Sequence, residues 1–147
     1  MPPNTANTKK MMAKLGQLYE RLCSLPFVGE PLARSMSRNL GRMIFYLSGS
    51  KTRRMSSIKE LKEYLLNTGK EMDFPFEVIE ESMGAESFEF TVNGCPYGYN
   101  RPNQARACDA AMEMDRVLFH LLGGELTVLD TAPQGVKKCR ILLKLRK

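Results

Sequence analysis

Residues 88–108 read FEFTVNGCPYGYNRPNQARAC and predict a strand, an irregular loop and the first turns of a helix. The first five residues alternate between apolar and polar, which is typical of a strand with one buried face. The loop 94–102 contains two glycines and two prolines, which interrupt regular structure. Apolar residues then recur at helical spacing as far as Leu122, where two glycines follow.

The regions on either side of this stretch predict further strands and helices. Phe74, Phe76 and Val78 alternate in the same way, so we expect a hairpin with the strand that begins at Phe88. The other predicted strands span residues 125–131 and 136–145, and three predicted helices span residues 9–24, 30–47 and 57–67. The sequence therefore predicts an α+β fold. In it, two or three N-terminal helices precede a ββαββ module, whose antiparallel sheet packs against helices.

The third predicted helix has clear signals at both ends. Ser57 and Glu60 have the spacing of a capping box, in which each side chain accepts a hydrogen bond from a free backbone donor. Gly69 is the predicted stop, because glycine is favoured just after a helix C-terminus.

Basic residues are concentrated in the first third of the chain. Residues 1–54 hold ten Lys or Arg and two Glu, whereas residues 55–147 hold twelve Lys or Arg and fourteen Asp or Glu. We therefore predict a basic helical extension over 1–54 and a cysteine-containing α+β domain over 55–147. The extension includes a stripe of arginines at helical spacing, namely Arg34, Arg38 and Arg42.

Three uses of this basic segment, residues 9–54, are open. It packs on the α+β domain or on the second chain of a dimer, or it binds a protein partner, or it lies on an anionic membrane surface. Nucleic acid is disfavoured as a partner, because aromatic residues do not interleave with the arginine stripe.

The sequence contains no signal for membrane insertion or export. Its longest apolar runs are far too short to span a bilayer, and residues 1–8 lack the apolar core of a signal peptide. We therefore expect a cytoplasmic protein, in which disulfides between its four cysteines are not expected.

Three of the cysteines are predicted to lie around one cavity. Cys95 is in the loop, Cys108 is in the first turns of the helix and Cys139 is on the apolar side of the last strand. Three thiolates suit zinc or an iron–sulfur cluster with one open position. Ordinary core packing and a nucleophilic cysteine are the alternatives. The only histidine, His120, is predicted on the wet face of the helix, which argues against a Cys–His hydrolase.

Asp115 is an acidic residue predicted on the apolar side of the same helix. It follows Cys108 by seven residues and therefore lies on nearly the same line. A buried carboxylate is normally paired, hydrogen-bonded or protonated. Asp115 therefore has a structural partner, or faces a ligand as an acid, base or metal ligand, or lies exposed at the edge of the apolar arc.

The loop before the helix supplies further candidates for ligand binding. Tyr97, Tyr99 and Arg101 are placed to contact a carboxylate or an aromatic ligand near a helix N-terminus, where anions bind well. The alternative is that the glycines and prolines of this loop only shape a connection.

Four segments together resemble the L-2-amino-thiazoline-4-carboxylic acid hydrolase family, whose fold looks related to four-vinyl-reductase-type small-molecule-binding domains. The segments are FEVIEE at 76–81, FEFTVNGCPY at 88–97, ACD at 107–109 and KCRI at 138–141. The resemblance covers roughly residues 74–145. It departs from the family at Cys139-Arg140-Ile141, where the family often has Cys-x-Phe, and in the position of the acid after the helix cysteine.

The resemblance implies a small enzyme that hydrolyses a C–N bond in a sulfur or nitrogen heterocycle. Cys95, Cys108 and Cys139 would line its site, and Asp109 or Asp115 would transfer protons. The alternative is a sensing or adaptor module without catalysis. Its cavity would hold a hydrophobic ligand or a metal cluster, and its basic helices would bind a partner. A structural protein with merely packed cysteines is the third possibility.

Overall fold

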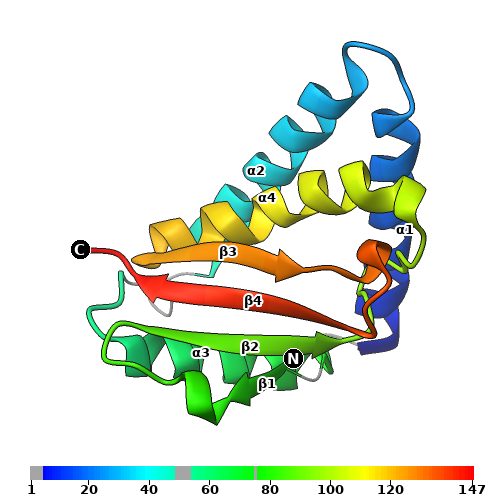
Figure 1. The fold of residues 1–147 in the computed structure, drawn as a ribbon. Coiled ribbons are helices and arrows are strands. Elements are labelled where there is room, and N and C mark those ends of the chain that lie inside the picture. The colour runs from blue at the N-terminus through cyan, green and yellow to red at the C-terminus, as the bar shows by residue number, and fades with distance from the viewer. Residues whose placement is uncertain (1–4, 49–53, 75) are drawn as a thin grey trace.

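The computed structural model describes residues 5–48, 54–74 and 76–147. Four strands form one antiparallel sheet in the order β1-β2-β4-β3 (Figure 1). The strands are β1 (Phe76–Ile79), β2 (Ser87–Asn93), β3 (Gly124–Asp130) and β4 (Lys138–Leu145). The helices are α1 (Thr5–Cys23), α2 (Gly29–Leu47), α3 (Ile58–Met72) and α4 (Ala105–Leu121). This arrangement confirms the predicted α+β class, with helices before an antiparallel ββαββ module.

The helices α3 and α4 cover one face of the sheet. Phe88 and Phe90 of β2 point to this face and are at most 2% exposed. They pack there against Leu61 of α3, Leu118 of α4 and Leu143 of β4. Burial of each such side chain is worth about 1.5 to 3 kcal/mol. A shift of one residue would turn every strand's apolar set outward, so this core fixes the strand register.

The helix α3 begins at its predicted cap but ends later than predicted. The Ser57 hydroxyl accepts a hydrogen bond from the backbone N–H of Glu60 at 3.2 Å. The helix then continues through Gly69 to Met72, and Asp73 ends it in a left-handed conformation with φ of 55°. Gly69 is therefore not the stop. A side chain at Gly69 would come within 2.6 Å of the Phe76 ring, so glycine lets the first strand pass close to the helix.

The helices α1 and α2 form a hairpin that projects beyond the sheet, and α2 lies along α4 (Figure 1). The loop after β2 fixes α1, because the Tyr99 hydroxyl donates a hydrogen bond to the Gly16 carbonyl at 2.6 Å. Both helices thus pack on the rest of the described chain, which is the first of the uses predicted for the basic segment.

The buried face of α2 is built from small residues. Gly29, Ala33, Ser37 and Gly41 recur every four residues and are buried. The Ser37 hydroxyl donates to the Ala111 carbonyl and accepts from the Met114 N–H, each at 2.9 Å. The helical spacing of the larger apolar residues predicts that Leu32, Met43 and Leu47 lie on the buried side of this helix, but they are 49%, 48% and 77% exposed. The expected orientation of α2 is therefore wrong for these three.

The described helices include none that combines the length and the apolar character needed to cross a bilayer.

Candidate functional site

An apolar cavity of about 170 Å³ lies between the sheet and the helices α1, α3 and α4, and Ile44 of α2 also reaches its wall. Each surrounding element supplies part of its lining. Representative residues are Met12 of α1, Leu65 and Thr68 of α3, Phe76 of β1, Phe90 and Val92 of β2, Met112, Leu118 and Phe119 of α4, Val128 of β3 and Ile141 of β4. A cavity of about 150 Å³ lined by Leu, Ile and Phe holds benzene, so this one is large enough for a small apolar group.

The three predicted cysteines all line this cavity. Cys95 enters from the loop after β2, Cys108 from the first turns of α4 and Cys139 from the start of β4. Burial raises the pKa of the Cys108 thiol to about 12, and the neighbouring Cys95 and Cys139 add to this rise. Burial also raises the pKa of Cys139, whose sulfur accepts a hydrogen bond from the Ala132 N–H at 3.4 Å. At neutral pH, Cys108 and Cys139 are therefore thiols and not thiolates.

The predicted zinc or iron–sulfur site on Cys95, Cys108 and Cys139 is wrong. Over residues 5–48, 54–74 and 76–147, no group of three or more His, Cys, Asp or Glu side chains is arranged to hold a metal ion. The physical reason lies in the surroundings, since a thiolate is the metal ligand and the apolar cavity favours neutral thiols. The three residues share a cavity wall without forming a metal site.

Asp115 also lines the cavity, on the same side of α4 as Cys108. Its carboxyl is enclosed by protein, and its remaining accessible surface faces the cavity. Burial raises its pKa to about 6, and the only opposing influence is the charge of Arg116. No side-chain hydrogen bond to Asp115 occurs within the described residues. Asp115 therefore lies in the cavity wall, and no structural partner for it is found among those residues; that it acts as an acid, a base or a ligand contact stays a prediction.

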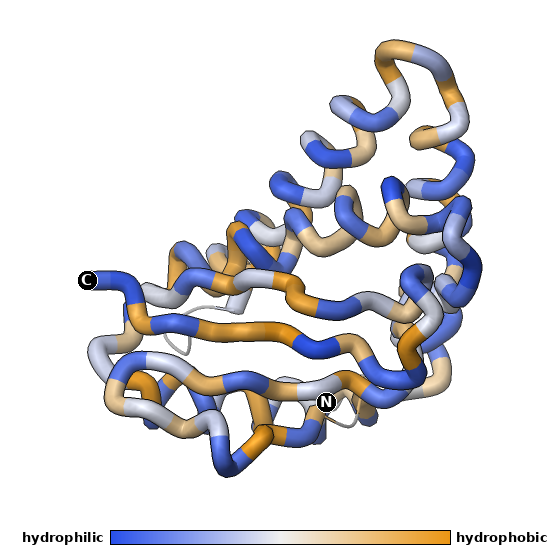
Figure 2. Tube along the Cα trace, in the orientation of Figure 1, coloured by the Kyte–Doolittle hydropathy of each residue, from blue (hydrophilic) through white to orange (hydrophobic). Residues whose placement is uncertain are grey.

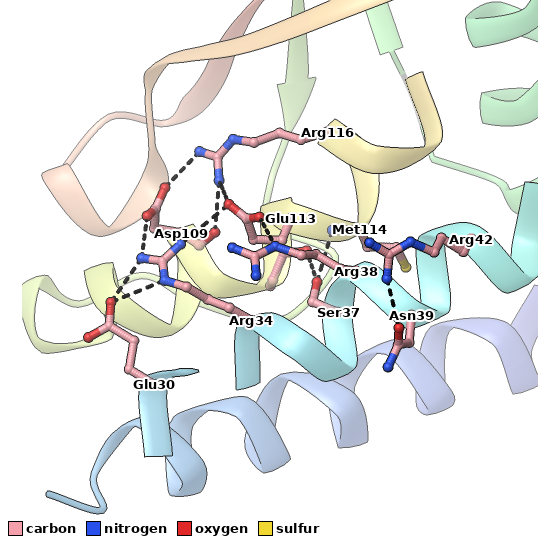
Figure 3. Close-up of polar contacts among 11 residues, drawn as sticks. Glu30, Arg34, Ser37, Arg38, Asn39, Arg42, Asp109, Glu113, Met114 and Arg116 are labelled. Carbon is pink, nitrogen blue, oxygen red and sulfur yellow. Dashed lines mark hydrogen bonds and ion pairs between the residues drawn. The ribbon is translucent and has the colours of Figure 1, made fainter. Parts of the chain in front are cut away.

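Asp109, the other predicted proton-transfer residue, lies away from the cavity in an ion-pair network between α2 and α4 (Figure 3). Its two carboxylate oxygens pair with Arg34 at 2.6 Å and with Arg116 at 2.7 Å. Burial alone would raise the pKa of Asp109, but hydrogen bonds from Arg116 and Arg34 lower it. The carboxylate is therefore held ionised as a structural partner.

Glu113 forms the centre of the same network (Figure 3). It pairs with Arg38 at 2.8 Å, with Arg116 at 2.9 Å and with Arg34 at 3.4 Å. Burial opposes its ionisation, but the hydrogen bond and charge of Arg38 lower its pKa. Two arginines of the predicted basic stripe, Arg34 and Arg38, are thus neutralised inside the molecule and do not form a free basic surface.

The residues of the predicted ligand-binding loop do not all reach the cavity, because two of them contact α1 instead. Tyr97 is 7% exposed, lines the cavity and stacks on Tyr99 with ring centroids 5.8 Å apart. Tyr99 is 2% exposed and anchors α1 through its hydroxyl, so it does not line the cavity. Arg101 is exposed and lies 3.5 Å from Glu20 of α1. Of the three predicted contacts, only Tyr97 reaches the cavity.

The sequence reasoning missed the contribution of α3 and α1 to the cavity wall. Tyr64 and Thr68 of α3 and Met12 of α1 all line it. Tyr64 and Thr68 are four residues apart and so share one side of their helix, which is a signal that the sequence does contain. No local signal indicates that α1 reaches the cavity, because its position depends on the distant Tyr99.

Together, the fold and the cavity define a small α+β protein with an apolar cavity between one face of its sheet and the helices. Comparison with solved structures finds a similar protein, a trafficking protein particle complex subunit 3 from Naegleria fowleri covalently bound to palmitic acid. The match has a TM-score of 0.62 and 14% sequence identity, and it covers 97% of this chain and 96% of that chain. At this identity the likeness concerns the fold. No family model and no curated protein matches the sequence.

The likeness overturns the resemblance to the amino-thiazoline carboxylate hydrolase family. That resemblance depended on three cysteines within residues 74–145 and left the N-terminal helices unexplained. The structural match extends over nearly the whole chain, helices included. The hydrolase interpretation is therefore wrong, as is the expectation of metal chemistry at the cysteines.

Proposed function

We propose that this chain is a non-catalytic adaptor that holds an alkyl chain in its apolar cavity and binds a protein partner through α1 and α2. The main support for the proposed alkyl-chain binding is the cavity itself. It is apolar on nearly all sides, and the four strands and the helices α1 to α4 all contribute to its wall. The similar Naegleria fowleri protein is bound to palmitic acid, which supports the binding of an alkyl chain. That protein is also a subunit of a particle complex, which supports the binding of a protein partner.

The chemistry of the cavity favours binding over catalysis. A nucleophilic cysteine needs a thiolate or a nearby base. Burial raises the pKa of both Cys108 and Cys139, and His120 is exposed and does not line the cavity. An alkyl chain requires no such groups. Each methylene that leaves water contributes about 0.8 kcal/mol, so a chain gains affinity with every carbon that fits.

Blocking the cavity tests the ligand part of this proposal. Val128 of β3 lines the cavity, whereas its neighbour Thr127 is exposed on the other face of the sheet. Val128→Phe fills the cavity, and Thr127→Phe adds the same ring outside it. We expect Val128→Phe to weaken binding of an environment-sensitive fluorescent long-chain alcohol by tenfold or more, and Thr127→Phe to leave it within twofold. Equal binding by both variants would show that the probe binds outside the cavity, and the proposal of alkyl-chain binding in the cavity would be wrong.

The exposed apolar side chains of α1 and α2 support the partner part of the proposal. Of ten large apolar side chains exposed in the described residues, nine lie between Met11 and Leu47. Phe27 is 97% exposed at the turn between the helices, where Figure 2 shows a hydrophobic tip. Tyr46 and Leu47, at the other end of α2, are 71% and 77% exposed. Monomeric proteins rarely leave so many apolar groups together, and such surfaces mark sites of association.

A second copy of this chain is the partner that we propose. Light scattering after gel filtration tests it, because a dimer has twice the 16.7 kDa mass of one chain. We expect a dimer for the unaltered chain and a monomer for the double variant Phe27→Ser with Leu47→Ser. The control is Val136→Ser, which removes an exposed apolar side chain outside α1 and α2. A monomer at all concentrations would rule out the second copy as partner.

A further inference from the structure

The apolar wall of the cavity contains one acidic side chain, that of Asp115. The wall is apolar apart from a few groups, and Asp115 is the only ionisable carboxyl group among the lining residues. The lining contains no lysine, arginine or histidine. An ionised carboxylate in such surroundings is costly unless a partner is present.

The nearest cation does not serve as that partner. Arg116 follows Asp115 directly, but its guanidinium is directed to Asp109 and Glu113 (Figure 3). There it donates to Asp109 at 2.7 Å and to Glu113 at 2.9 Å. Arg34 and Arg38 are likewise held in that network. The cations of this part of the molecule are therefore committed elsewhere, and Asp115 keeps its hydrogen-bonding capacity for something inside the cavity.

Tyrosine hydroxyls surround the same place. Tyr97, Tyr64 and Tyr19 approach Asp115 closely enough for its charge to raise their pKa values, although burial is the larger cause in each case. The hydroxyls of Tyr97 and Tyr19 are buried without a hydrogen-bond partner. The Ser37 hydroxyl lies near that of Tyr19 but is already bonded to the backbone of α4. Buried polar groups are normally paired. Of the two unpaired residues Tyr97 lines the cavity and Tyr19 does not, so the Tyr97 hydroxyl is the one that points to a missing polar ligand.

We infer that the cavity selects a primary alkylamine, with its ammonium group on Asp115 and the Tyr97 hydroxyl and its chain along the apolar wall. An ammonium group offers three donors and a positive charge, which is what an unpaired buried carboxylate requires. A fatty acid would place a second carboxylate beside Asp115 and is disfavoured by like charge. This inference depends on the proposed alkyl-chain binding and adds the identity of the head group.

Four decyl compounds that differ only in the head group provide the test, with affinities measured by isothermal titration calorimetry below the micellar concentration. They are decylamine, decanol, decanoate and decyltrimethylammonium. We expect decylamine to bind at least tenfold more tightly than decanol, and decanoate to bind most weakly. Decyltrimethylammonium has the charge but no N–H donor, so its affinity should fall below that of decylamine. The chain's net charge of +6 disfavours general attraction of amines to the surface.

The variant Asp115→Asn removes the charge and nearly keeps the size. It should lower the preference for decylamine over decanol by tenfold or more, whereas the control Asp130→Asn, in a surface ion pair with Arg140, should leave it unchanged. The comparison of head groups in the unaltered protein keeps the inference testable if the variant does not fold.

The outcomes separate this inference from the proposed function. If all four compounds bind equally, or decanoate binds best, the alkyl chain is bound but the amine inference is wrong. The same holds if Asp115→Asn keeps the preference for the amine. If none of the four binds, both the inference and the alkyl-chain proposal are wrong.

Discussion

Asp115 and Glu113 stand two residues apart on α4 and have opposite electrostatic surroundings. Glu113 pairs with three arginines, and Arg38 and Arg116 lower its pKa, whereas Asp115 lies in the wall of an apolar cavity, where burial raises its pKa to about 6. The helix places successive residues about 100° apart, so two positions are enough to separate a structural acid from one that faces the cavity. The two carboxylates should therefore affect stability in opposite directions as pH changes.

Asp115→Asn should stabilise the free protein at neutral pH. The folded pKa of about 6 exceeds the ordinary value of 3.8, so the charged form opposes folding. Stability is lost as pH rises from about 4 through 6, and the loss is complete above the folded pKa. At 1.36 kcal/mol for each pH unit, the difference in unfolding free energy between Asp115→Asn and the unaltered chain should grow by about 2 to 3 kcal/mol from pH 4 to pH 7.

Urea unfolding at several pH values measures this difference. Asp130→Asn is again the surface control, and its difference should stay within about 0.5 kcal/mol over the same range. A flat difference for Asp115→Asn would mean that the carboxyl has a partner in the folded protein.

Glu113→Gln should destabilise the protein, with the reverse dependence on pH. Glu113 pairs with three arginines, and its removal leaves Arg34, Arg38 and Arg116 in excess at the α2–α4 contact. A loss of about 1 to 2 kcal/mol is expected at pH 7. Because the folded pKa is lowered, this contribution is present above the ordinary value of 4.5 and disappears as pH falls through the folded pKa.

Urea unfolding at pH 7 and below pH 4 measures this prediction, with Glu125→Gln on the exposed side of β3 as control. A loss for Glu113→Gln that persists unchanged at low pH would show that the effect is steric.

At the scale of secondary-structure elements, the contact between α2 and α4 depends on small residues. A side chain at Gly41 would come within 2.5 Å of the Met114 carbonyl oxygen, and a backbone atom cannot move aside cheaply. Ser37 spans the same contact through two hydrogen bonds to α4. The two helices therefore approach closely enough for the arginines of α2 to reach the acids of α4.

Gly41→Ala tests this close approach. Alanine is favoured over glycine in a helix by about 1 kcal/mol, so an exposed site would gain stability. We expect a net loss of about 1 to 3 kcal/mol, because the added methyl group forces the helices apart. Gly84→Ala is the matched control, since its nearest neighbour atom would be 3.5 Å away. Thermal unfolding of both variants measures the difference, and a more stable Gly41→Ala would refute the close contact.

The elements differ in how far the sequence predicted them. The strands were predictable because alternation within Phe88–Val92 is a local signal. The same kind of alternation in the last strand put Cys139 on the face of Ile141 and Leu143. The buried face of α2 could not be predicted. Its glycine, alanine and serine residues carry little hydropathic signal, and their burial depends on the position of α4. The sequence also placed Cys108 and Asp115 on one line of α4, and both line the cavity. It could not show that Tyr99 would bond to α1, 83 residues away.

At the scale of the whole molecule, the helices and the sheet together enclose one apolar space. The three cysteines that suggested a metal site are part of its wall, and the apolar surroundings that suit an alkyl chain also keep the thiols of Cys108 and Cys139 neutral. The arginines that suggested a basic surface are partly used to hold α2 on α4. The surface left for a partner is the apolar one between Met11 and Leu47.

The most direct test of alkyl-chain binding is a crystal structure of the protein with a decyl chain that carries bromine on its last carbon. Anomalous scattering locates the bromine without reference to the protein model. We predict a single strong bromine peak inside the cavity, near Phe90, Leu118 and Ile141. A peak only on the exposed faces of α1 and α2, or no peak at a saturating concentration of the compound, would contradict the proposal that the cavity holds an alkyl chain.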